Sequence, residues 1–336
     1  MSLEIKTTSV QPRRNTFANV ARRSGSDRPA SRYEEATLDM QSTVNSHYRP
    51  TWAPEHELFD AARTAIRMED WYALKDPRQY YYGTYTIARS RMIESTEKNL
   101  SFVEKRGMLG KMDPSWTERV ETYLLPMRHL EWGANMNNCN ITDIGYGTSM
   151  TQATMFAAMD RLGIAQIIGR IGLLMDGQSG SKLDQAKGVW MDDPVWQPLR
   201  RLVEDTFVLT DWFELFVAQN LALDGLLYPL VYKRFDAEGQ RFGATGLSLL
   251  TEFMVDWHDE TSKWIDAVVK RAAEESPANR VLLTQWTAAW EKRAAEALLP
   301  LAEHVLGDQA SDTLTELRAD LNDRLKKVGI DSAGAE

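Results

Sequence analysis

The 336-residue chain has a single cysteine, Cys139, so no disulfide can form within it and a reducing compartment is expected. It also lacks an uncharged apolar run close to the roughly 20 residues that a membrane-spanning helix needs. The best candidate, residues 162–175, is too short and contains Arg170. These two absences predict a cytoplasmic protein with no membrane anchor.

Motifs for several common chemistries are missing too. Residues 177–182 lack the spacing of a phosphate-binding loop, and no cysteines and histidines are spaced as zinc ligands. Di-iron helical bundles place a Glu and a His three residues apart, on one helix face. Here the residues three before the five histidines are Val44, Ala53, Pro126, Val255 and Leu301. A chain without this motif is not expected to activate oxygen itself.

Strand-like alternation is nearly absent, whereas helical periodicity fills the chain after residue 51. We expect helices near residues 54–72, 77–105, 115–140, 147–176, 195–234, 243–274, 278–303 and 308–328. Two long helices, a break and two more long helices are the layout of a four-helix core with one long crossover. The predicted fold class is therefore all-α, a ferritin-like helical bundle with additional helices.

The N-terminal region differs from the rest in composition and charge. Residues 1–33 hold seven basic and two acidic residues, a net charge of +5, and the whole chain carries −9, so the remainder carries −14. We expect an extended arm over residues 1–50, a helical domain over 51–305 and a C-terminal helix and tail over 306–336. A mitochondrial transit peptide has a similar composition, but this stretch has few apolar residues for an amphipathic helix.

A basic arm on an acidic body favours a protein partner over nucleic acid. The arm is expected to become ordered only against a partner subunit, where four of its arginines would meet carboxylates and an aromatic ring would fill a shallow pocket. These residues are Arg13, Arg14, Arg22, Arg23 and Phe17.

Four tyrosines gather at the start of the helix expected over residues 77–105: Tyr80, Tyr81, Tyr82 and Tyr85. Their rings would surround most of that helix, which favours burial against a partner over a cage for a ligand.

Three segments carry a family resemblance: residues 76–95 (DPRQYYYGTYTIARSRMIES), 128–172 and 211–232 (DWFELFVAQNLALDGLLYPLVY). They resemble the β subunit of the hydroxylase component of bacterial multicomponent monooxygenases, above all the phenol hydroxylases. The resemblance covers roughly residues 30–330. It implies a ferritin-like, ribonucleotide-reductase-like fold shared by the α and β subunits, of which only α keeps the di-iron ligands.

The resemblance also implies where metal ligands would stand. Ala134 follows the Leu-Glu-x-Gly pattern of the first ligand helix, and Arg161 and Ile164 replace the Glu and His of the first motif. In the second motif Glu260 is kept and Lys263 replaces His, while Glu214 and Asp224 are candidates on the helix over residues 211–232. We expect the two cations to repel a metal and to pair with the remaining acids Glu131, Asp160 and Glu260. The alternative is that these groups reach the surface and are solvated.

The function implied by the resemblance is that of a non-catalytic β subunit with no cofactor of its own. It would support a di-iron α subunit that hydroxylates phenol to catechol with O₂ and NADH, in an assembly of two α, two β and two γ chains. A reductase and a small regulatory protein would be transient partners. Two alternatives stay open: a stand-alone metalloenzyme with the ligands His129, Glu131 and Glu260, and a helical binding module that uses the basic arm.

Overall fold

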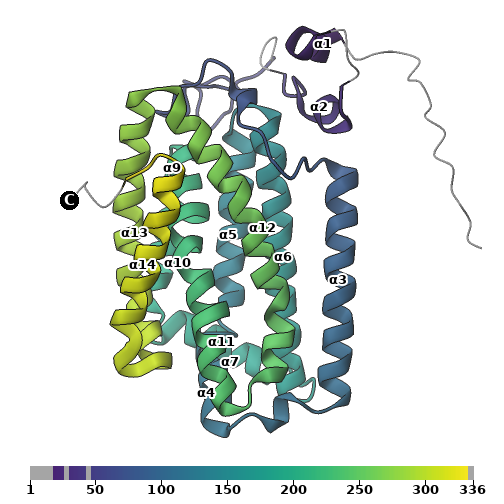
Figure 1. The fold of residues 1–336 in the computed structure, drawn as a ribbon, viewed down its shortest axis with the longest axis vertical. Coiled ribbons are helices and arrows are strands. Elements are labelled where there is room, and N and C mark those ends of the chain that lie inside the picture. Colours follow the sequence, from purple (N-terminus) through teal and green to yellow (C-terminus); the bar gives the residue numbers. More distant parts are fainter. Residues whose placement is uncertain (1–17, 26–29, 43–46, 332–336) are drawn as a thin grey trace, which may run out of the picture.

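The computed structural model describes residues 18–25, 30–42 and 47–331, and every regular element within these ranges is a helix. The prediction of an all-α fold is confirmed. Long helices pack side by side, and two short ones, α1 (Ala18–Ser24) and α2 (Arg32–Thr37), lie at one end of the bundle (Figure 1). The predicted contact residues Arg13, Arg14 and Phe17 lie outside the described residues.

Four helices form the centre: α5 (Met127–Ile144), α6 (Thr148–Met175), a helix over Trp212–Phe242, and α12 (Thr245–Glu275). The third is continuous but irregular. It comprises α9 (Trp212–Phe216), the π-helix η3 (Val217–Leu223), α10 (Asp224–Pro229), the π-helix η4 (Leu230–Phe235), α11 (Asp236–Gly239) and the 3₁₀ turn η5 (Gln240–Phe242). Its length and apolar composition would suit a membrane span, but 94% of its most apolar window is buried in the protein. It is the core helix, and it is longer than residues 162–175, the segment that the sequence offered as the best membrane candidate.

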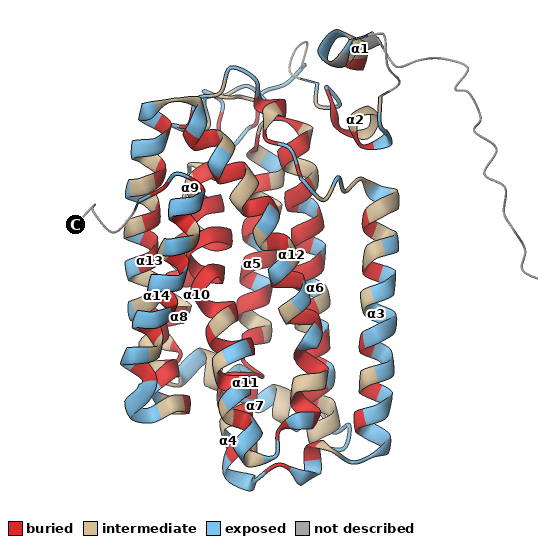
Figure 2. Ribbon diagram, viewed as in Figure 1, coloured by how far each residue is buried: buried red, intermediate tan, exposed pale blue. Residues whose placement is uncertain are grey.

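Other helices surround this centre. α3 (Tyr82–Lys105) packs on α12, and α13 (Pro277–Leu306) packs on η3, α12 and α8 (Gln197–Thr206). α14 (Ala310–Lys327) turns back onto α13 and α10 and adds four leucines to the same core. The remaining elements are α4 (Pro114–Tyr123), α7 (Ser181–Asp192) and the 3₁₀ turns η1 (Trp71–Ala73), η2 (Leu109–Lys111) and η6 (Gly307–Gln309). Figure 2 shows the buried residues on the inner faces of the helices.

The sharp turn between α5 and α6 depends on glycine. Gly147 has φ +88°, a conformation that residues with a Cβ rarely adopt. Its N–H donates to Oε1 of Gln41, 2.6 Å away, and the Nε2 of Gln41 donates to the carbonyl of Gly145 at 3.0 Å. The turn is therefore fixed by a side chain from the N-terminal region.

The helix expected over residues 115–140 is two helices, α4 and α5, separated at Leu124–Pro126. Pro126 has no N–H, so the carbonyl of Thr122 loses its helical partner. The indole N–H of Trp196 donates to that carbonyl at 2.7 Å. Tertiary contact thus compensates for a break that helical periodicity alone did not reveal.

The helix expected over residues 54–72 is wrong, since these residues form turns and end in the short η1. Side chains here bond to nearby backbone and compete with a helix. Asp60 accepts from the N–H of Ala62 at 2.7 Å, and Asp70 accepts from the N–H of Tyr72 at 3.0 Å.

Two further differences concern residues 181–234. No helix was expected where α7 lies, because only Ala186 of α7 is buried and its apolar period is weak. The helix expected over residues 195–234 is interrupted between α8 and α9. Asp211 caps α9 there by accepting from the N–H groups of Phe213 and Glu214 at 2.9 and 3.1 Å.

Part of the predicted extended arm is folded against the chain itself. The side chain of Ser31 accepts from the N–H of Glu34, and Glu34 accepts from the N–H of Ser31, so a capping box starts α2. Val20 packs with Leu38 and Tyr72 in a small apolar cluster. The expectation that the whole arm needs a partner to become ordered is therefore wrong for these residues.

Candidate functional site

The centre of the bundle holds one arginine, Arg161 of α6, with no exposed surface. Its guanidinium bonds to Glu131 of α5 at 3.0 Å and forms an ion pair with Asp224 of α10. The hydroxyl of Tyr228 lies 2.8 Å from both the guanidinium and Oε1 of Glu131. We call these four residues the central ion cluster. They connect three of the four central helices.

Aromatic rings close the central ion cluster. The guanidinium of Arg161 lies 4.5 Å from the ring centroid of Trp257 on α12 and 5.3 Å from that of Tyr228. A desolvated cation gains from such contacts with ring faces. The fourth central helix therefore contributes a ring rather than a carboxylate.

The charges of the cluster do not balance, because two carboxylates face one guanidinium. Burial and, to a smaller extent, the charge of Glu131 raise the pKa of Asp224 to about 6, against the opposing effect of Arg161. For Arg161, burial lowers the pKa, but Asp224, Tyr228 and Glu131 raise it by more, so the guanidinium stays charged. The excess of negative charge in the cluster thus contributes to the raised pKa of Asp224.

A π-helical turn brings more polar groups to the cluster. Within η3 and α10, Gln219 and Asp224 are five residues apart, a spacing that the i→i+5 pattern of a π-helix brings into register. The amide of Gln219 donates to Asp224 at 3.0 Å, and the amide of Asn137 donates to Gln219 at 2.9 Å and to Thr206 at 2.8 Å. A chain of buried hydrogen bonds therefore links α8 to the central ion cluster.

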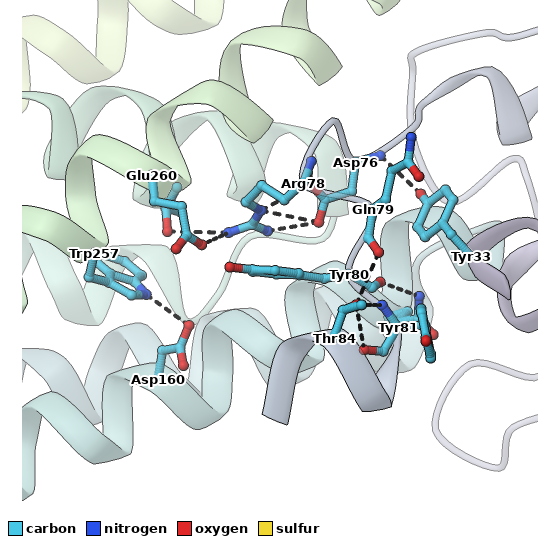
Figure 3. A network of polar contacts seen from close by, with 12 residues as sticks. Tyr33, Asp76, Arg78, Gln79, Tyr80, Tyr81, Thr84, Asp160, Trp257 and Glu260 are labelled. Carbon is cyan, nitrogen blue, oxygen red and sulfur yellow. Dashed lines mark hydrogen bonds and ion pairs between the residues drawn. The ribbon is translucent and has the colours of Figure 1, made fainter. Parts of the chain in front are cut away.

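A second cluster lies at the junction of α3, α6 and α12. Arg89 of α3 binds Asp160 with two bonds of 2.8 Å and Glu260 at 3.0 and 3.1 Å. Arg78 binds Asp76 at 2.9 Å and Glu260 at 3.3 Å. We call these five residues the edge ion cluster. Figure 3 shows four of its members, Asp76, Arg78, Asp160 and Glu260, and the indole N–H of Trp257 pointing to Asp160, a bond of 2.8 Å.

The positions inferred from the resemblance are only partly brought together. Arg161 pairs with Glu131, as expected, and Ala134 and Ile164 are fully buried on the same two helices. Lys263, however, is exposed, so its expected pairing with core acids is wrong.

The expected partners of Arg161 also need correction. Asp160 and Glu260 pair with Arg89 in the edge ion cluster and not with Arg161. The side chain from α12 that reaches Arg161 is Trp257, three residues before Glu260.

Five residues of the two clusters were not assigned from the sequence. Asp224 was one of two unplaced candidates, and Tyr228, Arg89, Arg78 and Asp76 were not considered. The other candidate, Glu214, accepts from the indole of Trp290 at 3.0 Å and lies outside both clusters. The segment resemblance contained Arg89 and Tyr228, but only three-dimensional contacts identify their partners.

The central donor set does not fit a metal ion. Among the described residues, no three His, Cys, Asp or Glu side chains are grouped to hold one. The two central carboxylates are bridged by the guanidinium of Arg161, a fixed cation in the space between them. Such a site repels a divalent ion and offers too few ligands.

Comparisons with known proteins agree with this architecture. Residues 52–276 match the sequence model of the Methane/Phenol/Alkene Hydroxylase family. The chain belongs to this family. It is 51% identical to the oxygenase component DmpL of phenol 2-monooxygenase from Pseudomonas sp. (strain CF600), over 99% of both chains. It is 45% identical to the oxygenase component MhpL of phenol 2-monooxygenase from Acinetobacter pittii (strain PHEA-2), over 98% of both.

Solved structures of hydroxylases share the fold. The match to a xenon-pressurized phenol hydroxylase from Pseudomonas sp. OX1 has a TM-score of 0.92 and 49% identity, covering 98% of this chain and 99% of the other. A toluene 4-monooxygenase structure with toluene bound matches with a TM-score of 0.75 at 20% identity, over 92% and 100% of the two chains, and shows the fold alone. The helical bundle described above is thus the hydroxylase fold.

In this hydroxylase-family chain, the predicted tyrosine interface is mostly an internal structure. Tyr85 is buried, donates to Asp160 at 2.9 Å and stacks on Phe156 with centroids 4.2 Å apart. The guanidinium of Arg78 lies 4.8 Å from the ring centroid of Tyr80. Burial raises the pKa of Tyr80 to about 12.

Tyr81 is half-buried before the start of α3, and Tyr82 is 74% exposed. The interface prediction is wrong for Tyr85. Of the four tyrosines, Tyr82 presents the most surface to a partner.

Of the four arm arginines predicted to meet a partner, Arg22 and Arg23 are described, and they have different surroundings. Arg22 is exposed. Arg23 binds Asp39 at 2.9 Å and Asp70 at 2.7 Å and lies 4.5 Å from the ring centroid of Tyr72. The carboxylates that Arg23 meets in this structure belong to its own chain, and its contact with a partner stays a prediction.

The histidines do not form an alternative metal site. His129 stacks near Trp190, and burial together with Arg128 and Lys187 lowers its pKa to about 4. Glu131 is bound by Arg161, and Glu260 by Arg78 and Arg89. The ligand set His129, Glu131 and Glu260, considered from the sequence, is not assembled.

Proposed function

We propose that this chain is the non-catalytic β subunit of a di-iron phenol monooxygenase. In this role it supports a separate catalytic α subunit and helps to build an assembly that also contains a γ subunit. The α subunit would hold the iron and hydroxylate phenol to catechol with O₂ and with electrons from an NADH-dependent reductase. A small regulatory protein would dock transiently, and the assembly would work in the cytoplasm.

One observation carries the proposal: the guanidinium of Arg161 lies between two carboxylates at the centre of the bundle. A centre of this kind gives the helices an electrostatic connection without a redox-active group. The relatives support a partner-dependent role, since they are oxygenase components and, in Ectopseudomonas mendocina, a "hydroxylase component subunit beta" of the toluene-4-monooxygenase system. That last relative is 24% identical over 76% of this chain and 80% of its own length.

The test is co-expression of this chain with the genes encoded beside it. We expect a large subunit to co-purify, iron to follow the large subunit when the chains are separated, and phenol hydroxylation to need both chains. Stoichiometric iron in the separated chain described here, or phenol hydroxylation by this chain with reductase alone, would contradict the proposal.

A further inference from the structure

One exposed surface of the central bundle is apolar, whereas the solvent-facing side of a helix usually carries polar and charged residues. Five large apolar side chains of α5 and α6 are 40–53% exposed: Trp132, Met136, Met155, Met159 and Leu162. Within residues 131–138 and 155–165, all of them described, no other residue is exposed. We call these five residues the α5/α6 face. An uninterrupted apolar patch of this kind is typical of a surface that another chain covers.

The five side chains adjoin because the two helices run antiparallel in a fixed register. The amide of Asn135 on α5 donates to the carbonyl of Ala158 on α6 at 2.8 Å. Three residues before Asn135 is Trp132, and four after Ala158 is Leu162, so these two side chains lie at the same level. Met136 lies at the level of Met155 and Met159. The α5/α6 face therefore spans both helices.

The shape of the α5/α6 face suits a helix. Met155, Met159 and Gly163 form one ridge with a spacing of four residues, and Trp132 and Met136 form another. A Cβ added to Gly163 would meet no atom within 4 Å, so a neighbouring backbone can approach closely there. Methionine side chains adapt to the shape of what they contact.

The face continues into an open groove of about 1040 Å³. Trp132 and Met136 line this groove together with Trp52 and Phe207, and the rings of Trp132 and Phe207 are 6.4 Å apart. A helix lying on the α5/α6 face could place one large side chain in the groove. The surface thus offers both a flat apolar contact and a pocket for an anchor residue.

Charge argues against a second copy of this chain as the occupant. The described part of the bundle belongs to residues 34–336, which carry −14, and two such bodies would repel each other. The α5/α6 face itself contains no charge that could offset the repulsion. Relatives in this family are subunits of hydroxylase components. We therefore infer that a different subunit of the hydroxylase covers the α5/α6 face.

We propose that the α5/α6 face is the docking surface for an apolar helix of the catalytic hydroxylase subunit. This inference rests on the proposed function and adds the place of contact. The uncharged helical face defines the chemistry of the partner element as aliphatic and aromatic side chains at helical spacing. The adjoining groove has room for one large side chain opposite Trp52 and Phe207, and its lining also includes charged residues, among them Glu55, Arg63 and Asp211.

The test uses the full chain co-expressed with its large hydroxylase subunit. Met159→Arg and Leu162→Arg place a charge on the face, and Gly163→Leu fills the point of close approach. We expect each to weaken co-purification about 30-fold or more. The thermal melt of the isolated chain should stay nearly unchanged, because Gly163 has open space around it and Met159 and Leu162 are 50% and 42% exposed. The matched control is Val281→Arg. Val281 is 55% exposed and lies on α13, a helix that does not contribute to the α5/α6 face.

Each outcome separates this inference from the proposed function. If the parent chain binds the large subunit and the three variants bind equally well, the contact lies elsewhere and only this inference fails. If the parent chain does not bind the large subunit at all, the proposed function fails. Self-association of the parent that Met159→Arg abolishes would assign the face to a second copy. Equal loss of binding in Val281→Arg would show that added charge acts non-specifically and would overturn the assignment.

Discussion

The two ion clusters use the same groups in different surroundings. In each, an arginine from one helix meets two carboxylates from other elements: Arg161 with Glu131 and Asp224, and Arg89 with Asp160 and Glu260. The side chains of the central trio are at most 1% exposed, whereas Glu260 at the edge is 26% exposed. Only the edge ion cluster has a second arginine, Arg78.

This difference teaches what each cluster does for the fold. Water cannot relieve a change in the central ion cluster, so its charges depend wholly on one another. In the edge ion cluster, solvent and Arg78 both help to compensate the charge of Glu260. The charges of the central ion cluster can therefore be retained or removed only together, whereas the edge ion cluster attaches α3 and the segment before it.

The largest effect is expected for Arg161→Met, which leaves two buried carboxylates without a cation. We expect a loss of about 3–5 kcal/mol in the free energy of unfolding, measured by urea denaturation. Arg170→Met is the matched control, since Arg170 pairs with Glu97 at the surface and both are about half exposed. The control should lose less than about 1 kcal/mol. Equal losses in the two variants would mean that burial does not distinguish them.

A smaller loss is expected for Arg89→Met, about 2 kcal/mol, the value of a charge-assisted bond. Arg78 stays beside Glu260 in this variant, and Asp160 keeps the bonds from Tyr85 and Trp257. The same urea denaturation should show that this loss shrinks as salt is raised, because the edge is partly solvated. A loss as large as that of Arg161→Met would remove the distinction between centre and edge.

The two clusters should respond to pH with opposite signs. Burial raises the pKa of Asp224 to about 6, so its contribution is most favourable at acidic pH and is lost as pH rises from about 4 through 6. For Glu260, burial raises the pKa, but Arg89 and Arg78 lower it by more. The contribution of Glu260 to the free energy of unfolding is therefore present at neutral pH. It is lost as pH falls below the usual pKa of a glutamate and through the lowered pKa of Glu260.

Unfolding of Asp224→Asn and Glu260→Gln between about pH 3 and 7 checks these signs, because the contribution of Glu260 changes only as pH falls through its lowered pKa. Relative to the parent chain, Asp224→Asn should improve as pH rises, and Glu260→Gln should worsen. Parallel curves for the two variants would contradict the opposite pKa shifts.

The smallest effects concern the tyrosines next to the edge ion cluster. Tyr85→Phe removes one hydroxyl that donates to Asp160 and should cost about 1 kcal/mol in the free energy of unfolding. Tyr82→Phe is the control, because its ring is 74% exposed, and it should change stability by less than about 0.5 kcal/mol. If the control were the costlier of the two, the inward placement of Tyr85 would be wrong.

The sequence predicted the long helices well, because their apolar periods run for many turns. α6 and α12 were expected within one or two residues of their observed ends. It failed at residues 54–72, where Asp60 and Asp70 bond to the backbone, and at Pro126, whose break is compensated by distant Trp196. Such competition between local and tertiary bonds leaves no periodic signal.

The candidate site was likewise predictable from the sequence only in part. The pairing of Arg161 with Glu131 could be anticipated, because a cation beside leftover acids needs a partner. Lys263 could not be placed, since one residue of register decides whether a helical side chain points to the core or to solvent. Asp224 depends on a π-helical turn, which shifts the inner face of the helix and has no simple sequence signature.

We infer that the Arg161 guanidinium is the counter-charge on which the two acids at the centre of the bundle depend. The most direct measurement is the unfolding free energy of Arg161→Met alone and combined with Glu131→Gln and Asp224→Asn. We predict that the combined variant regains most of the loss, because no unpaired charge is left buried. A combined variant that loses the sum of the separate effects, or more, would contradict the account.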